Sequence, residues 1–270
     1  MKRLSIILAV IVIAAVSAPL SGQSIWSDPT QDQRSIGLEV IKPNFDGEPE
    51  HTLTTSVFFL TLKSPLTNAL SLHLEAPFAH GAYRDHDGFS RNSMGNPYLG
   101  IDLHGEDTPL AVELGVRLPV AKSDNLGAQV GTFSNYDRLE AFVADELSVR
   151  VMGNYRYDNK SGLMFHLRGG TIFLVNTDKQ MFEEASDVNY GYSAQLGYDT
   201  KAFSLIGMFC GRVLTEEDFN FGERSFHELG FAAKVGLGSL RPGASFRVPL
   251  DSDSRSILDF VAALTLEFQK

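Results

Sequence analysis

The chain has 270 residues, of which 23 are basic and 33 are acidic, and its formal net charge at pH 7 is −10. This acidic balance argues against binding of DNA or RNA, whose phosphates select basic surfaces. The only cysteine, Cys210, excludes a disulfide within one chain. The length fits one large β domain or two smaller ones. No Pro- or Ser-rich linker divides the chain.

The N-terminus has the parts of a secretory signal peptide. Lys2 and Arg3 precede an apolar run over 4–16, and small and turn-forming residues follow it. The apolar run is shorter than the about 20 residues that a membrane-spanning helix needs. We therefore predict a signal peptide over 1–22 that is cleaved on export.

We expect residues 23–33 to form a short periplasmic leader. An alternative is that this segment, which contains the lone Trp26, folds into the barrel and plugs it. Cys210 lies far from the predicted cleavage site, which excludes a lipid anchor on a processed N-terminal cysteine.

Apolar and polar residues alternate along nearly the whole remaining chain. In one segment, Val112, Leu114 and Val116 alternate with Glu113 and Arg117. Strand side chains point to opposite faces with period two, so such a strand suits a wall with lipid outside and polar groups inside. The sequence predicts an all-β, transmembrane, antiparallel up-and-down β-barrel over 34–270. Its strands, about 12 in number, are expected at 34–42, 52–63, 69–78, 95–104, 109–121, 140–157, 161–174, 189–199, 202–214, 225–237, 239–249 and 256–268.

The connections between these runs alternate in length. Those at 63–68, 106–108, 158–160, 200–201 and 238 are short. Those at 43–51, 79–94, 122–139, 176–188, 215–224 and 251–255 are mostly longer. In bacterial barrels the short turns face the periplasm and the strand number is even. We therefore expect both termini in the periplasm and 122–139 in a long outer loop.

A soluble β-sandwich or closed β-barrel is the alternative fold, because it also alternates. The last run favours a membrane barrel, since its apolar residues share one face and end in an aromatic residue, as in the C-terminal signal strand of outer-membrane barrels. Gln269 and Lys270 follow that aromatic residue, which is a departure from the pattern. The face comprises Leu258, Phe260, Ala262, Leu264, Leu266 and Phe268.

If the apolar face meets lipid, the opposite face lines the lumen and carries both signs of charge. Acids and bases on neighbouring strands are expected to pair and hold the wall rigid, while any unpaired excess sets ion preference. The predicted lumen-lining residues are Glu39, His73, Glu75, Asp102, His104, Glu113, Arg117, Arg150, Arg156, His166, Arg168, Asp199, Glu228, Lys234, Arg247, Asp259 and Glu267.

Ser71, His73 and Glu75 have the residue types of a nucleophile, a base and an orienting acid. They lie two residues apart on one strand face and point to the lumen, whereas an outer-membrane lipid hydrolase must present such groups to lipid. The segment 79–94 holds two histidines and two aspartates without a known metal-ligand spacing. We therefore predict no catalytic residue, no metal and no cofactor.

Two stretches carry a family resemblance. The segment 93–103 reads SMGNPYLGIDL, and 111–121 reads AVELGVRLPVA. Together they resemble the outer-membrane family named for the meta pathway of phenol degradation. The resemblance implies passive uptake of small, hydrophobic or aromatic compounds. It also implies a structural role at strand ends, and no catalysis, for the matching Gly95, Asn96, Pro97 and Pro119.

The sequence thus favours a bacterial outer-membrane barrel that admits a small solute passively. Its expected partners are outer-membrane lipids, the barrel-assembly machinery and a small solute, but no nucleic acid. A second hypothesis is a closed structural or surface-interaction barrel whose outer loops, such as 122–139, bind a partner. A third is membrane-lipid hydrolysis that depends on His73. The pattern leaves the solute, the oligomeric state and the openness of the lumen undetermined.

Overall fold

A computed structural model of the chain describes residues 34–45, 53–83, 90–105, 108–123, 125–178, 186–215 and 225–270. The predicted signal peptide, the leader over 23–33 and the aspartates of the segment 84–89 lie outside these residues, as do most acidic residues of the long connections. In the described part of the chain, no helix is long and apolar enough to cross a membrane.

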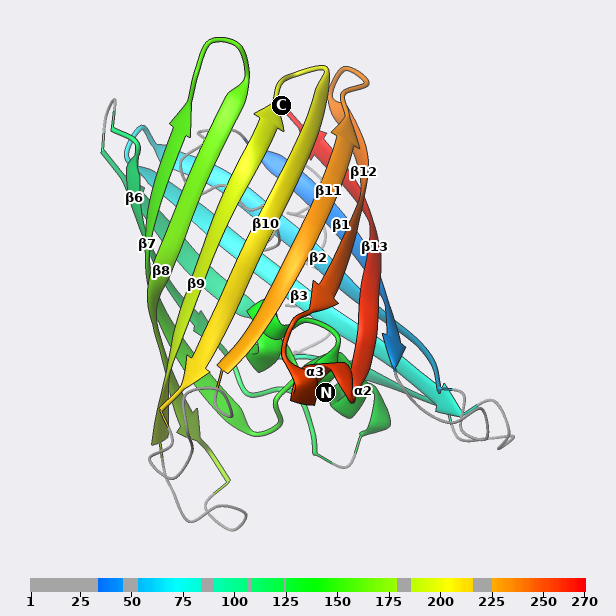
Figure 1. Cartoon of the computed structure of the whole chain (residues 1–270). Coiled ribbons are helices and arrows are strands. Elements are labelled where there is room, and N and C mark those ends of the chain that lie inside the picture. The colour runs from blue at the N-terminus through cyan, green and yellow to red at the C-terminus, as the bar shows by residue number, and fades with distance from the viewer. Residues whose placement is uncertain are drawn as a thin grey trace, which may run out of the picture.

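The described residues form a closed, antiparallel β-barrel (Figure 1). The first strand, β1, pairs with both β2 and the last strand, β13, and β2 also pairs with β3, so the ring is complete. The strands are β1 (Ser35–Phe45), β2 (Leu53–Thr67), β3 (Leu70–Tyr83), β4 (Ser90–Met94), β5 (Tyr98–His104), β6 (Leu110–Arg117), β7 (Glu146–Asp158), β8 (Leu163–Asn176), β9 (Ser186–Asp199), β10 (Phe203–Leu214), β11 (Ser225–Val235), β12 (Leu240–Pro249) and β13 (Leu258–Gln269).

The barrel has twelve strand positions although the described residues form thirteen strands, because β4 and β5 share one position beside β3. Both pair with β3, β4 beside Phe78–Ala82 and β5 beside Leu70–Glu75. The chain leaves the ladder between them, at residues 95–97. The predicted all-β, up-and-down barrel of about 12 strands is therefore confirmed.

The two faces of the wall differ as the alternation predicts. Large apolar side chains such as Leu205, Phe231 and Leu264 are exposed on the outside, whereas Glu113 and Arg117 are buried inside. A soluble barrel would bury its apolar face, so the outward apolar band overturns the alternative soluble fold and suits a lipid environment.

The two ends of the barrel are unlike. Tight turns join β7 to β8, β9 to β10 and β11 to β12 at one end, where Arg34 and Lys270 also meet: the Lys270 N–H donates to the Arg34 carbonyl at 3.1 Å. The helical elements lie at the other end (Figure 1). They are α2 (Leu126–Phe133), the 3₁₀ segment η2 (Tyr136–Ala141) and α3 (Ser252–Arg255).

The connection between β6 and β7 corrects the sequence analysis. Residues 118–123 and 125–145, hereafter the insert, fold into the barrel instead of forming an outer loop over 122–139, and β7 starts at Glu146 rather than at 140. Ala141 and Phe142 are buried against the inner wall. Their apolar character, next to a real strand, made this part of the insert resemble the beginning of β7.

Candidate functional site

An apolar patch on the inner wall holds the insert against one side of the barrel. Phe142 is almost completely buried, and its ring meets that of Phe59 on β2 edge to face, with centroids 5.9 Å apart. Glycines make room for it, since a Cβ at Gly95 or Gly131 would lie 2.7 or 2.4 Å from the Phe142 ring. The whole cluster comprises Ile41, Val57, Phe59, Ala79, Tyr136, Ala141, Phe142, Leu258, Val261 and Ala263.

Asn96, in the break between β4 and β5, fastens both ends of the insert. Its side-chain oxygen accepts hydrogen bonds from the N–H groups of Val120 and Ala121 at 2.7 and 2.9 Å. Its amide nitrogen donates to the carbonyls of Glu140 and Val143 at 3.0 and 2.6 Å. Asn96 is fully buried, so these four bonds satisfy its amide inside the protein.

The Gly-Asn-Pro motif of the family resemblance lies at the break between β4 and β5 and contacts the start of the insert. The Gly95 N–H donates to the Pro77 carbonyl at 2.9 Å, and the Pro97 carbonyl accepts from the Leu118 N–H at 3.0 Å. Pro119 follows within the first residues of the insert. The Gly-Asn-Pro sequence thus ends one strand, starts the next and clamps the segment that enters the lumen.

Arg138 is the insert's main charged contact with β1 and β3. Its guanidinium pairs with Glu75 at 3.0 Å and with Glu39, and it lies over the Phe59 ring with Cζ 3.6 Å from the centroid. Glu75 also pairs with Arg117 on β6 at 2.6 Å. Burial lowers the pKa of the Arg138 guanidinium, but Glu39 and Glu75 outweigh this effect and raise it.

Glu140 is the matching acidic contact on the opposite side of the insert. It pairs with Arg150 on β7 and with Arg212 on β10, the latter at 2.5 Å, and Arg117 lies 3.8 Å away. Burial favours the neutral acid, yet the three guanidinium groups hold the pKa of Glu140 well below its usual range. Glu140 is therefore a buried carboxylate at neutral pH.

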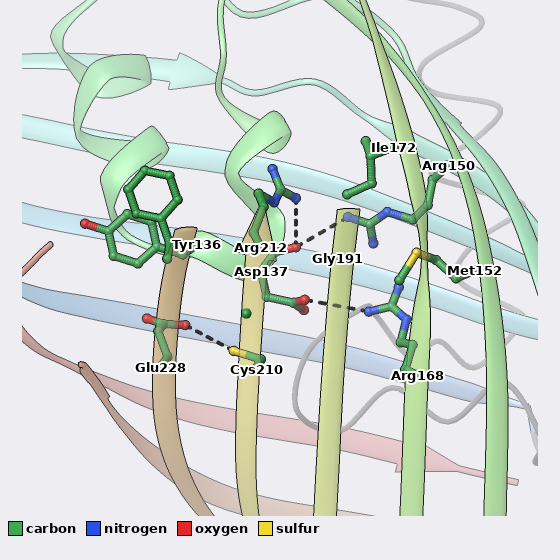
Figure 2. A pocket seen from close by; sticks show the side chains of 12 residues that line it. Tyr136, Asp137, Arg150, Met152, Arg168, Ile172, Gly191, Cys210, Arg212 and Glu228 are labelled. Carbon is green, nitrogen blue, oxygen red and sulfur yellow. Dashed lines mark hydrogen bonds and ion pairs between the residues drawn. The ribbon is translucent and has the colours of Figure 1, made fainter. Parts of the chain in front are cut away.

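A small cavity lies between the insert and β7–β11, beside these ion pairs. Figure 2 shows Asp137 between three arginines. Its carbonyl accepts from Arg150 and Arg212 at 3.4 Å each, and its carboxylate lies 3.8 Å from Arg168. Burial raises the pKa of Asp137, but Arg168 and the other arginines lower it overall. The cavity is small: its water-accessible volume is about 10 Å³, which is room for about one water molecule. Its lining includes Tyr136, Asp137, Arg150, Met152, Arg168, Ile172, Cys210, Arg212, Phe226 and Glu228.

Further ion pairs and polar contacts continue along the lumen. Arg247 on β12 donates to the Asn135 side chain of the insert at 2.7 Å and lies 3.6 Å from Glu228. Arg168 pairs with Glu113 at 2.9 Å. Towards the short turns the pairs are Lys63 with Asp102, Arg156 with Asp199, Arg241 with Asp199, and Lys234 with Glu267. His104 and His166 are buried as well.

Asp259 is the predicted lining residue that does not face the lumen. It is exposed and accepts a hydrogen bond from Asn44 at 2.9 Å, whereas its neighbour Leu258 is fully buried in the inner patch. The pairing register between β1 and β13 shifts at Asn44 and Phe45, which pair with Phe260 and Leu258, so Asp259 between them has no opposite residue on β1. An irregularity of this kind exchanges the two faces for the residues beyond it.

Ser71, His73 and Glu75 do not assemble into a catalytic site. All three side chains are buried in the barrel. Both Glu75 oxygens are taken up by Arg117 and Arg138, and the His73 ring lies edge to face against Tyr98 at 5.4 Å. The described residues also contain no group of three or more His, Cys, Asp or Glu side chains placed to hold a metal ion.

Sequence reasoning missed several residues around the cavity. Arg212 occupies an inward position of a predicted strand, so the alternation of apolar and polar residues could have identified it as a lining residue. Asn135, Asp137, Arg138 and Glu140 belong to the insert, where no strand period exists, and only their contacts reveal them.

Comparisons with known proteins place the fold. No protein-family model and no curated protein sequence matches the chain. An outer membrane channel from Pseudomonas putida F1 is similar in structure, with a TM-score of 0.61 and 13% identity over 93% of this chain and 99% of that one. LpxR from Salmonella typhimurium has a TM-score of 0.52 and 12% identity over 87% of this chain and 99% of that one. The CymD monoaromatic hydrocarbon channel has a TM-score of 0.51 and 8% identity over 94% of each chain.

At these identities the likeness establishes the barrel fold alone. The resemblance to the meta-pathway family stays a prediction.

Proposed function

We propose that this chain is a bacterial outer-membrane β-barrel through which small solutes diffuse passively. The observation that carries the proposal is the closed wall around a charged lumen that the insert narrows. The insert packs against β1–β3 and β13, and the cavity left between it and β7–β11 has room for about one water molecule, so passage of a solute requires the insert to shift. The fold likeness to two channels supports the same function.

The outward apolar band supports a location in a lipid bilayer. Outer-membrane barrels have short turns in the periplasm and long connections outside. By that rule the insert enters the lumen from the cell exterior, and the chain ends near Arg34 and Lys270 lie on the periplasmic side.

The lining of the cavity supports a solute with both apolar and polar parts. Met152 and Ile172 offer apolar surface, and the Tyr136 ring stacks on that of Phe226 with centroids 5.3 Å apart. Arginines of the lining offer hydrogen-bond donors to an anionic or polar group. The chemistry of this lining matches a small aromatic compound that carries an oxygen function, which would enter once the insert shifts, and no catalytic step is needed to move it.

The closed structural barrel is the second candidate, and the buried ion pairs of the insert favour it. Arg138 and Glu75 are completely buried, so the insert is held firmly where it lies. If the cavity is sealed at either end, the barrel conducts nothing and acts through its surface.

One pair of substitutions on β7 separates these candidates. Met152 faces the cavity, and its neighbour Val151 faces outward. We expect refolded wild-type protein to conduct ions in planar bilayers and to admit small aromatic solutes into liposomes. Met152→Trp should reduce the flux severalfold by blocking the space beside the insert, whereas Val151→Trp should leave it unchanged. Absence of both conductance and flux in the wild type would refute the channel and favour the structural barrel.

A further inference from the structure

A row of glycines crosses the outer face of the wall. The residues of this row are paired across neighbouring strands and all point away from the lumen, and a groove follows the part of the row from Val112 to Tyr192. In order from β6 to β11, the row comprises Val112, Gly153, Gly169, Tyr192, Gly211 and His227.

The floor of the groove is bare backbone. A Cβ at Gly153 or Gly169 would have no neighbour nearer than a carbonyl oxygen at 3.7 or 3.9 Å. Apolar side chains stand along the adjacent row and form the side of the groove, which measures about 680 Å³. They are Leu110, Tyr155, Leu167, Ala194 and Phe209.

A polar group adjoins the groove at Tyr192. The Tyr192 hydroxyl lies 2.7 Å from His227 Nε2, and His227 Nδ1 lies 2.9 Å from an Asp251 oxygen. The other Asp251 oxygen accepts the backbone N–H of His227 at 2.5 Å. When the Nδ1–H of His227 donates a hydrogen bond to Asp251, the Nε2 atom can accept a hydrogen bond from the Tyr192 hydroxyl. The hydroxyl oxygen can still accept a hydrogen bond from a ligand.

The aromatic rings keep this polar group in place. The Tyr192 ring covers Gly211, where a Cβ would lie only 2.5 Å from it, and Phe209 stacks on the His227 ring with centroids 5.7 Å apart. The side chains of His227 and Asp251 are 18% and 21% exposed, so the group remains accessible from outside.

The position of the polar group indicates the occupant. Asp251 lies in the connection between β12 and β13, at the barrel end with long connections, whereas Val112 lies near the short turns at the start of β6. The groove and the polar group that adjoins it at Tyr192 therefore run together from the rim of the apolar band into its depth. A ligand that fits is polar at the rim and apolar below it.

We propose that this groove binds one lipid of the surrounding leaflet. Its acyl chain lies over Gly153 and Gly169, and its headgroup or ester region bonds to the Tyr192–His227–Asp251 group. The proposal needs the barrel to lie in a membrane but does not need it to transport a solute, so conductance and lipid binding can fail separately.

Native mass spectrometry of the refolded full chain, titrated with dipalmitoyl phosphatidylethanolamine in detergent, tests the proposal. We expect wild-type protein to retain one lipid. Gly169→Leu fills the groove without a backbone clash and should raise the dissociation constant about tenfold or more. His227→Phe keeps an aromatic ring but removes the polar partner, and should weaken binding about fivefold.

Gly207→Leu is the matched control. Gly207 also lies on the outer face of the wall, where a Cβ would meet its nearest neighbour at 3.7 Å, but it lies outside the groove. This variant should retain the lipid as the wild type does. Heat-dependent mobility in SDS gels verifies that each variant has folded. The proposal is overturned if folded wild-type protein retains no lipid, or if Gly169→Leu retains it as tightly as Gly207→Leu.

Discussion

Arg138 of the insert and Glu75 of β3 form an ion pair at 3.0 Å with neither side chain exposed to solvent. The two residues are 63 positions apart in the sequence, so the ion pair links the insert to a strand that lies far from it along the chain. Removal of either partner leaves a buried charge with one counterion fewer, because Arg138 keeps Glu39 and Glu75 keeps Arg117.

We therefore expect Glu75→Gln to destabilise the barrel strongly. Breaking a buried ion pair by removing one partner costs about 3–5 kcal/mol. Here Arg117 also loses its nearer partner and keeps only Glu140, at 3.8 Å. Urea titrations of protein refolded into vesicles measure the free energy of unfolding. The control is Lys122→Ala, which breaks the ion pair between Lys122 and Asp145. Because the lysine of this pair is 66% exposed, the substitution should cost no more than about 1 kcal/mol. Equal effects of the two substitutions would contradict the structural role of Glu75.

Asn96→Ala should loosen the insert without removing the wall. The substitution deletes four hydrogen bonds to the insert, each worth about 0.5–1.5 kcal/mol net. Cys210, the only cysteine, reports the change because it lines the cavity behind the insert. We expect a charged methanethiosulfonate reagent to modify Cys210 severalfold faster in this variant than in the wild type.

Asn92→Ala serves as the control for that measurement, since its side chain is exposed and bonds to His80 at 2.8 Å. The labelling rate of Cys210 should not change. A rate in Asn96→Ala equal to that of the wild type would show that Asn96 does not hold the insert.

The insert should respond to acid only at low pH. The folded-state pKa values of Glu140 and Asp137 lie below their ordinary values, so their stabilising effect is complete above the unfolded pKa of about 4 and is lost as pH falls towards the folded pKa. We expect constant conductance from pH 8 to 5 and a rise below about pH 4. Glu140→Gln removes the charge and should raise the conductance already at neutral pH. A transition of the wild type above pH 5 would contradict this assignment.

Arginines of the cavity should set its ion preference. Arg212→Ala removes one positive charge from the lining and should lower the anion-to-cation permeability ratio about twofold or more. Reversal potentials under a salt gradient measure this ratio. Lys160→Ala, in an exposed turn at the opposite end, removes the same charge from outside the cavity. Its ratio should equal that of the wild type, and a drop as large as that of Arg212→Ala would refute the effect of the lining.

The sequence contains enough information to predict the wall but not what fills it. Side chains in a strand obey a period of two, so alternation alone places Glu113 and Arg117 on the inner face. Asp259 is misplaced because one irregularity in pairing, invisible in the sequence, shifts the period. Arg138 and Glu140 have no period to follow, and their position depends on partners in β1, β3, β7 and β10 that only the closed barrel brings together.

The docking surface of the insert crosses the seam at which the barrel closes. Ile41 belongs to β1, whereas Val261 belongs to β13, and both contribute to the apolar patch that receives Phe142. These strands are the first and the last, so the patch is complete only after they have paired. The insert must therefore dock late in folding. Once docked, it resists separation of the seam, and the same segment that narrows the lumen also delays unzipping of the barrel.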